Sequence, residues 1–151
     1  MELCVKRFTE LSGEELYEIL RLRVSVFVVE QNCPYMELDN MDQSALHVYF
    51  RDDSGIQAYL RIMGKNSLRP YVSVGRVIAV KRRCGMGSKL LAEAIRLAKE
   101  SFKADKIYVE AQTYATGLYA KQGFVPISDE FLEDGIPHIK MLLDCSDTGI
   151  I

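Results

Sequence analysis

The stretch that decides the fold runs from Arg76 to Leu91 and reads RVIAVKRRCGMGSKLL. It begins with β-branched residues typical of a strand, passes through a basic turn with two glycines, and continues with the apolar spacing of a helix. The first N–H groups of a helix have no intrahelical partner and carry partial positive charge, so such a turn can hold a phosphate. Gly85 and Gly87 let the backbone approach a ligand because they have no Cβ atom.

Three phosphate-binding loops compete for this turn. A P-loop requires Gly-Lys followed by Ser or Thr, whereas Gly87 is followed by Ser88 and Lys89 in the opposite order. A dinucleotide fingerprint requires a third Gly or Ala, and Leu90 stands at that position. The remaining pattern, RRCGMG from Arg82 onward, resembles the acyl-CoA pyrophosphate loop of the GNAT superfamily of N-acetyltransferases. Taken alone, this hexamer fits a ligand-free turn between a strand and a helix equally well.

The composition indicates an ordinary globular domain. The 151 residues suit one domain with a sizeable core, and the fractions of apolar residues (48%) and charged residues (26%) are those of a globular protein. The net charge of −2 argues against nucleic acid or an anionic membrane as a partner. Basic side chains gather around the glycine turn instead, which favours a small anionic ligand; they are Lys81, Arg82, Arg83 and Lys89.

The four cysteines are scattered, and no C-x-x-C pair occurs. Because the chain also has only two histidines, no metal site is expected. Free thiols indicate a reducing compartment, and we expect the cytoplasm. Cys84 lies in the glycine turn, where a helix N-terminus could activate a thiol, but a small loop residue is the preferred interpretation. The first residues lack the apolar core of a signal peptide, and the longest apolar run, 24–29, is too short to cross a bilayer.

The chain alternates between the helical and the strand period. One helix is expected from Ser12, with the run 24–29 as its end or as a second short helix, before a polar loop over 30–43. A second helix follows Gly87, and a third covers 115–122. The second helix is expected to bury Leu90, Leu91, Ala94, Ile95 and Ala98. Strands are expected at 1–8, 46–51, 56–63, 71–80, 106–111, 123–127 and 139–143. This order predicts an α+β sheet with a parallel crossover in its middle, and a cleft at the strand ends beside the glycine turn.

Three further stretches resemble the same superfamily. LYAKQGF, residues 118–124, resembles the GNAT motif in which Tyr is followed, after three residues, by Gly-Phe. VFVVEQNCPY, residues 26–35, with the two aspartates and the histidine after it, looks like the ElaA-type branch. EDGIPH, residues 133–138, resembles the C-terminal signature of that branch. Because the resemblance spans nearly the whole chain, the sequence is identified as a member of the GNAT superfamily, in its ElaA-like branch.

The resemblance implies a fold and an activity. The fold is the α+β GNAT acyl-CoA N-acyltransferase fold, a mixed central sheet of six to seven strands flanked by about four helices, in one acetyltransferase domain over residues 1–151. The activity is acetyl-CoA-dependent N-acetyl transfer, by direct attack of an amine on the thioester. The acceptor would be a small molecule or a peptide, and a homodimer is left open. The alternative is a catalytically silent acyl-CoA-binding sensor or interaction module of the same fold.

The resemblance also assigns residues to the cofactor. The backbone at Ile78 and Val80 would pair with the pantetheine arm of acetyl-CoA, and Gln112 and Tyr119 would lie beside it. The pyrophosphate would rest on the glycine turn, whose residues are Arg82, Arg83, Cys84, Gly85, Met86, Gly87 and Ser88.

Aminolysis of a thioester needs an acid for the leaving thiolate and a base for an ammonium acceptor. A phenol with a pKa of ~10 can protonate, as it forms, a thiolate whose conjugate acid has a pKa of ~8.5, and the resemblance implies this role for Tyr119. The alternative is a core tyrosine with a satisfied hydroxyl. The candidate bases are His138, Glu30 and Glu110. His138 is preferred because imidazole titrates near neutrality, with Glu30 next; a histidine that only bonds the turn backbone is the alternative.

The acceptor is expected to bind the branch-specific N-terminal stretch at the acetyl end of the cleft. Acidic side chains there suit a cationic amine, although Asp39 and Asp42 fit the role of turn formers equally well. The candidate acceptor-binding residues are Arg23, Glu30, Gln31, Tyr35, His47 and His138.

Overall fold

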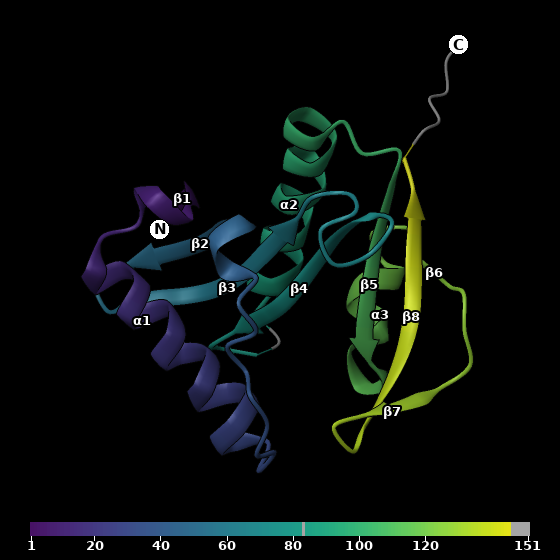
Figure 1. The fold of residues 1–151 in the computed structure, drawn as a ribbon, viewed down its shortest axis with the longest axis horizontal. Coiled ribbons are helices and arrows are strands. Elements are labelled where there is room, and N and C mark those ends of the chain that lie inside the picture. The colour runs from purple at the N-terminus through teal and green to yellow at the C-terminus, as the bar shows by residue number, and fades with distance from the viewer. Residues whose placement is uncertain (83, 146–151) are drawn as a thin grey trace.

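A computed structural model describes residues 1–82 and 84–145 of the chain. Its centre is a sheet in which eight strands follow the order β1-β2-β3-β4-β5-β8-β6, with β7 paired to β8 (Figure 1). Neighbouring strands are antiparallel except β4 and β5, which run parallel. The strands are β1 (Glu2–Arg7), β2 (Leu46–Asp52), β3 (Gly55–Met63), β4 (Val72–Ala79), β5 (Lys106–Gln112), β6 (Val125–Pro126), β7 (Phe131–Glu133) and β8 (Ile136–Asp144).

Three α-helices accompany the sheet in the described part of the chain: α1 (Gly13–Val24), α2 (Met86–Phe102) and α3 (Thr116–Ala120). The first helix begins at a capping box, because the Ser12 hydroxyl accepts the N–H of Glu15 at 3.1 Å and the Glu15 carboxylate accepts the N–H of Ser12 at 2.8 Å. A wider π-type segment (Ser25–Glu30) prolongs α1, so the run 24–29 extends the first helix. Short 3-10 turns occupy Phe8–Glu10, Asp42–Ser44 and Thr113–Ala115.

The expected α+β class with its parallel crossover is confirmed, while the number of elements differs from the expectation. The sheet has eight strands rather than six to seven because residues 131–144 form a hairpin, in which β8 begins at Ile136 and not at Ile139. Asp134 and Gly135 connect its strands with φ values of +51° and +77°, the left-handed conformation that tight hairpin turns require. The α-helices of the described residues number three rather than about four, because the run 24–29 joins α1.

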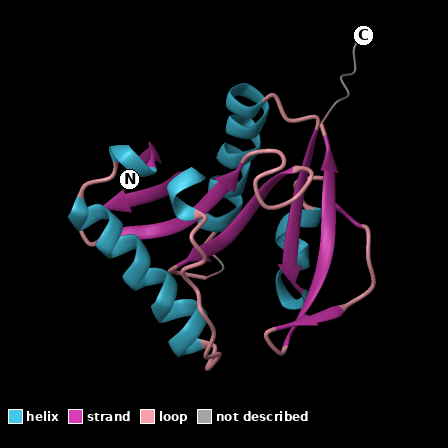
Figure 2. Cartoon of the chain, in the orientation of Figure 1, coloured by secondary structure: helices cyan, strands magenta, loops and turns pink. Residues whose placement is uncertain are grey.

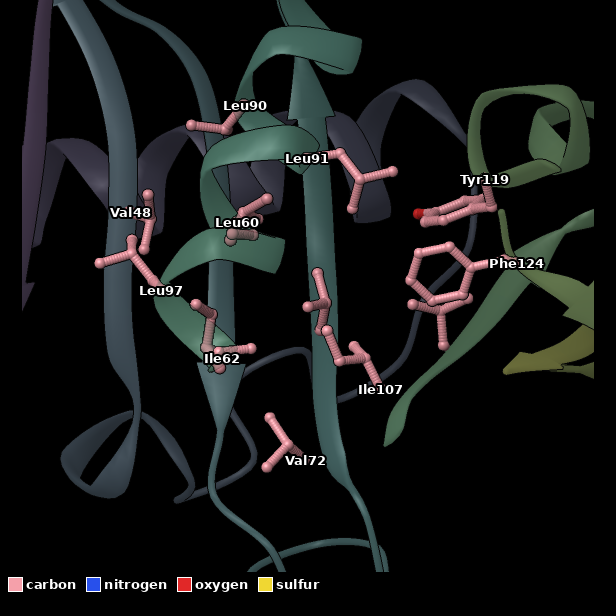
Figure 3. Packing of buried hydrophobic residues seen from close by; sticks show 14 of the residues in the cluster. Val48, Leu60, Ile62, Val72, Leu90, Leu91, Leu97, Ile107, Tyr119 and Phe124 are labelled. Atoms are coloured by element: carbon pink, nitrogen blue, oxygen red, sulfur yellow. The ribbon is translucent and has the colours of Figure 1, made fainter. Parts of the chain in front are cut away.

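The main core lies between α2 and one face of the sheet (Figure 3). The predicted buried face of α2 is largely correct. Leu97 is buried in addition, while Ile95 is only half-buried; the correctly predicted residues are Leu90, Leu91, Ala94 and Ala98. Alternate residues of β2 and β3 meet this helix, among them Val48 and Leu60.

The opposite face of the sheet is only partly covered. A second cluster joins Ile19 of α1 to Tyr49 and Tyr59, which alternate with the residues that meet α2. Figure 2 shows α1 beside β2 and β3, with β5, β8 and the β7–β8 hairpin at the other end of the sheet. The face that α1 does not cover, over β4, β5 and β8, is therefore the part of the sheet where a cleft can form.

The strands β4 and β5 are in register at only two positions, Val72 with Ile107 and Ser73 with Tyr108. Beyond these two pairs the strands diverge (Figure 1). A bulge adds to the divergence, because Arg76 and Val77 together oppose one residue of β3. Arg76 has a φ of +56°, a left-handed conformation that a non-glycine residue rarely adopts.

A buried network of ion pairs fastens the chain after α1 to the sheet. Arg23 has no exposed surface, and it donates to the carboxylates of Glu37 at 2.9 Å and Asp42 at 2.5 Å. From the sheet, Arg61 binds Asp42 at 3.0 Å, while Arg76 binds Glu37. The network balances three positive and three negative charges, on Arg23, Arg61, Arg76, Glu37, Asp39 and Asp42.

Replacement of Arg23 by Met should lower the free energy of unfolding by about 3–5 kcal/mol, because it leaves Glu37 and Asp42 buried with less cationic charge. Urea denaturation followed by circular dichroism measures the change. The matched control is Arg21→Met on the exposed face of the same helix, expected to change stability by about 0.5 kcal/mol or less. Equal effects of the two substitutions would show that the network does not stabilise the fold.

Candidate active site

A cleft of about 440 Å³ opens on the uncovered face of the sheet. Its floor is the diverging pair β4 and β5, one wall is the chain between Val26 and Asp39, and the other wall is the β7–β8 hairpin. Tyr119 and Arg82 line it near the start of α2, while Glu110, Glu133 and His138 line it at the hairpin. The cleft expected at the ends of the strands beside the glycine turn is present.

The glycine turn has the geometry of an anion site. Gly85 is the N-cap of α2 with a φ of +81°, no side chain caps the helix, and the first turn of α2 contains no acid. The N–H groups of the first helical residues therefore point out of the helix without a partner from the preceding turn. A Cβ added at Gly85 would meet nothing within 4 Å, which leaves the approach to these N–H groups open.

The turn residues named from the sequence lie around this helix start. Arg82 lines the cleft, while Cys84 is exposed and its thiol donates to the carbonyl of Lys81. The carbonyl of Ser88 accepts an N–H from Gln122 at 3.3 Å, which ties α2 to the segment after α3. Met86 begins the helix, and the prediction for Arg83 falls outside the described residues.

The two strand residues assigned to pantetheine differ in position. Ile78 lines the cleft on the side of β4 that β5 leaves unpaired. Val80 does not line the cleft, because its N–H donates to the carbonyl of Gln57 at 2.9 Å and its side chain is about half exposed. The structure therefore brings Ile78, but not Val80, to the cleft.

Tyr119 is held in place by the end of its own helix. Gly123 has a φ of +102° and donates to the carbonyl of Ala120, while Phe124 donates to the carbonyl of Tyr119, the two hydrogen bonds of a Schellman cap. The Phe124 ring then meets the Tyr119 ring edge to face, with 5.7 Å between centroids (Figure 3). The spacing Tyr-x-x-x-Gly-Phe is thus a helix end that fixes one aromatic ring against another.

The Tyr119 hydroxyl faces the cleft interior without a hydrogen-bond partner among the described residues. Burial raises the pKa of this phenol. Tyr119 therefore keeps its proton at physiological pH and holds it inside the cleft, where it is available to a leaving group.

The face of β5 toward the cleft is polar. Tyr108, Glu110 and Gln112 alternate with buried apolar residues along the strand, so all three point to the same side. Glu110 accepts from Arg69 at 2.7 Å and from the Tyr108 hydroxyl at 2.5 Å. Burial by itself would raise the pKa of Glu110, but these hydrogen bonds outweigh it and lower the pKa.

His138 lies opposite Gln112 in the β5–β8 register and is 8% exposed. Its Nδ1 is 2.7 Å from the carbonyl oxygen of Ile136, which can only accept, so Nδ1 carries a proton. In the neutral ring Nε2 therefore holds a lone pair, and no partner for it is found in the described ranges. The ring packs against Phe131 across the hairpin, with 5.9 Å between centroids.

The branch-specific stretch divides into residues that reach the cleft and residues that do not. Gln31 and Tyr35 line it, and the Gln31 and Gln112 side-chain amides bond each other at 3.2 and 3.3 Å. Burial raises the pKa of Tyr35. Glu30 is half exposed outside the cleft, where it forms an ion pair with Arg82, so the structure does not place it as a base.

The structure does not place Arg23 and His47 in the acceptor-binding set that the sequence predicts. Arg23 belongs to the buried ion-pair network, and His47 is bonded through Nδ1 to the Tyr59 hydroxyl and through Nε2 to the carbonyl of Asp42. Burial lowers the pKa of His47. Neither residue lines the cleft: Arg23 belongs to α1 and His47 to β2, and both side chains are fully buried.

Several residues of the cleft were missed from the sequence alone. The alternation of residues over 108–112 indicates that Tyr108 and Glu110 share one face of a strand. It does not decide which face of the sheet that is. Arg69 comes from the turn before β4, and no local pattern connects it to Glu110. Glu133 stood inside the EDGIPH stretch, but only the hairpin shows that its side chain approaches Glu110.

The fold and the cleft together define a domain with an open sheet face beside an uncapped helix start that can hold an anion. A profile of the acetyltransferase (GNAT) domain matches residues 10–145. A UPF0039 protein of Schizosaccharomyces pombe is 40% identical over 148 residues, which cover 95% of this chain and 97% of that protein.

Two crystal structures resemble the chain closely. Escherichia coli ElaA has a TM-score of 0.88 and 34% identity, covering 95% of this chain and 100% of ElaA. An acyl-CoA N-acyltransferase from Pseudomonas aeruginosa gives the same score and identity, covering 95% of this chain and 99% of that one. The chain belongs to the GNAT acetyltransferase family, in its ElaA-like branch, and has the acyl-CoA N-acyltransferase fold. Within the described residues no helix is long and apolar enough to span a membrane.

Gly87→Glu should weaken binding of acetyl-CoA by about tenfold or more, because it places a negative charge at the first turn of α2. Isothermal titration calorimetry with acetyl-CoA measures the affinity. Gly87→Ala is the matched control, since a Cβ there would meet Leu118 at an ordinary contact distance of 3.7 Å. Unchanged affinity of the Glu variant would remove the phosphate site from this turn.

Proposed function

We propose that the chain is an acetyl-CoA-dependent N-acetyltransferase that moves the acetyl group to an amine by direct attack on the thioester. The observation that carries the proposal is one cleft with a buried, protonated phenol toward the anion site and an unpaired imidazole nitrogen toward the hairpin. The family supports acyl transfer, and the name of the Pseudomonas relative supports an acyl-CoA donor. The free thiols agree with a cytoplasmic location.

The described residues fit acetyl-CoA. The uncapped start of α2 offers N–H groups for the pyrophosphate, with Arg82 beside it. The unpaired edge of β4 near Ile78 offers backbone groups for the pantetheine amides. Acetyl-CoA supplies the activated carbonyl of a thioester.

Tyr119 acts as the general acid in this proposal. As the new N–C bond forms and the C–S bond breaks, the thiolate takes the phenolic proton. Burial keeps the phenol protonated beforehand, so the proton is present when the leaving group needs it. The neighbouring Phe124 ring and the Schellman cap hold the hydroxyl in position.

His138 acts as the base, and Glu110 as its neighbour on the same wall. With Nδ1 bonded to the carbonyl of Ile136, the Nε2 lone pair accepts a proton from the ammonium or from the nitrogen after attack. A binding sensor needs no acid and base in one cleft, so Tyr119 and His138 favour an enzyme over a silent module.

The function itself is tested by thiol release from acetyl-CoA across a panel of amines that includes polyamines, aminoglycosides, amino acids and peptide N-termini. Amine-dependent release with mass-spectrometric detection of the acetylated acceptor is expected. Acetyl-CoA binding by calorimetry with no release for any acceptor would favour the sensor instead.

Tyr119→Phe should lower kcat by about 10²–10⁴ while the affinity for acetyl-CoA stays the same, because the ring packing remains and only the proton is lost. Steady-state kinetics and calorimetry on the same preparation separate these two quantities. A kcat close to that of the unmodified chain would mean that the thiolate takes its proton from water.

His138→Asn should remove from the pH profile of kcat/KM the acidic limb that belongs to the general base, and lower the plateau by about 10²–10⁴. The Asn amide can still donate to the carbonyl of Ile136, so the variant removes only the Nε2 lone pair. The matched comparison is Glu30→Gln at the ion pair outside the cleft, which should keep the limb. Survival of the limb in the His138 variant would place the base elsewhere.

A further inference from the structure

The charges that line the cleft are not matched. Each lining arginine already binds a carboxylate: Arg61 binds Asp39 and Asp42, Arg69 binds Glu110, Arg76 binds Glu37, and Arg82 binds Glu30. Of the lining carboxylates, Glu133 and Asp134 have no cation within ion-pair distance in the described part of the chain. The hairpin wall therefore carries uncompensated negative charge, while the positive charge of the cleft is already committed.

Glu133 and Glu110 form a carboxyl pair across the cleft wall. Their carboxyl groups lie close enough to interact electrostatically, and Glu110 is anchored by Arg69 and Tyr108. A carboxylate that lies beside another carboxyl group disfavours ionisation of that group. Desolvation at the cleft wall and the charge of Glu110 raise the pKa of Glu133. A cation that binds here relieves the repulsion between the two carboxylates.

A second observation points to a ligand at the same wall. His138 is more than nine-tenths buried, lines the cleft, and has an Nε2 atom without a partner among the described residues. The wall thus offers three acceptors, the carboxylates of Glu110 and Glu133 and the imidazole Nε2. A primary ammonium group carries three N–H donors and one positive charge, which matches this set in number and in sign.

We propose, on the basis of the N-acetyltransferase function above, that the acceptor is a cationic primary amine without a neighbouring carboxylate, whose ammonium group binds Glu110, Glu133 and His138. A substrate carboxylate next to the amine would find every lining arginine occupied and would lie near Asp134. The cleft therefore selects amines such as diamines and decarboxylated amino acids against amino acids themselves.

The selectivity is tested with pairs of acceptors that differ only in the carboxylate: agmatine with arginine, cadaverine with lysine, and phenethylamine with phenylalanine. Thiol release from acetyl-CoA gives kcat/KM for each compound. The amine of each pair should exceed its amino acid by about tenfold or more, because a like charge beside the carboxylates is unfavourable. Equal or higher values for the amino acids would overturn the proposal.

Glu133→Gln tests the binding site itself. This isosteric change at the rim should raise KM for the preferred amine by about 10- to 100-fold and leave kcat nearly unchanged, since a charge-assisted hydrogen bond is lost. The matched control is Glu130→Gln, three residues earlier and outside the cleft, expected to leave KM unchanged. Turnover with the same KM in both variants would overturn the ammonium site while the acetyltransferase function stands.

Calorimetry without acetyl-CoA tests the ammonium site separately from the acetyltransferase function. Calorimetry with agmatine, cadaverine and phenethylamine and no acetyl-CoA should show binding to the unmodified chain and about tenfold weaker or undetectable binding to Glu133→Gln. Such binding without thiol release from any acceptor of the wider amine panel would retain the ammonium site and refute the transferase. Neither binding nor release for any of these three amines, with release for another acceptor of the panel, would refute the ammonium site and retain the transferase.

Discussion

The parallel pair β4 and β5 is the constraint on which the rest of the structure depends. Parallel strands need a crossover, and here the crossover is α2, which packs on one face and begins directly after β4. Because the strands are in register only at Val72–Ile107 and Ser73–Tyr108, they diverge toward the start of α2. One connection therefore creates the opening in the sheet and places an uncapped helix N-terminus at its end.

The buried ion-pair network makes the opening into a cleft. The helix α1 covers only the first strands of the open face, so a wall must be built from the loop after it. Arg23 reaches from α1 to this loop, while Arg61 and Arg76 reach it from the sheet. Removal of six charges from water is unfavourable unless each finds a partner, which limits the loop to one position. The same pairing uses up cationic charge that a ligand would otherwise meet.

The end of α3 and the turn of the β7–β8 hairpin each set the position of side chains that face the cleft. The left-handed Gly123 closes the Schellman cap that fixes Phe124 against Tyr119. The left-handed turn at 134–135 closes the hairpin that carries Glu133 and His138 toward β5. In both places a short-range backbone requirement sets the position of a side chain that faces the cleft.

The sequence by itself determined the α+β class, the crossover, the glycine turn at the start of α2 and the buried face of α2. Each of these depends on residues that are close neighbours in the sequence. Tertiary structure alone decided which polar residues share the cleft. Arg23 and His47 were expected to bind the acceptor, yet Arg23 pairs with Asp42 and His47 bonds to Tyr59, both away from the cleft. Glu30 pairs with Arg82, which is distant in the sequence. Glu133 meets Glu110 only because β7, β8 and β5 align in one register. Charged side chains pair across long separations in the chain, and no local period records those pairings.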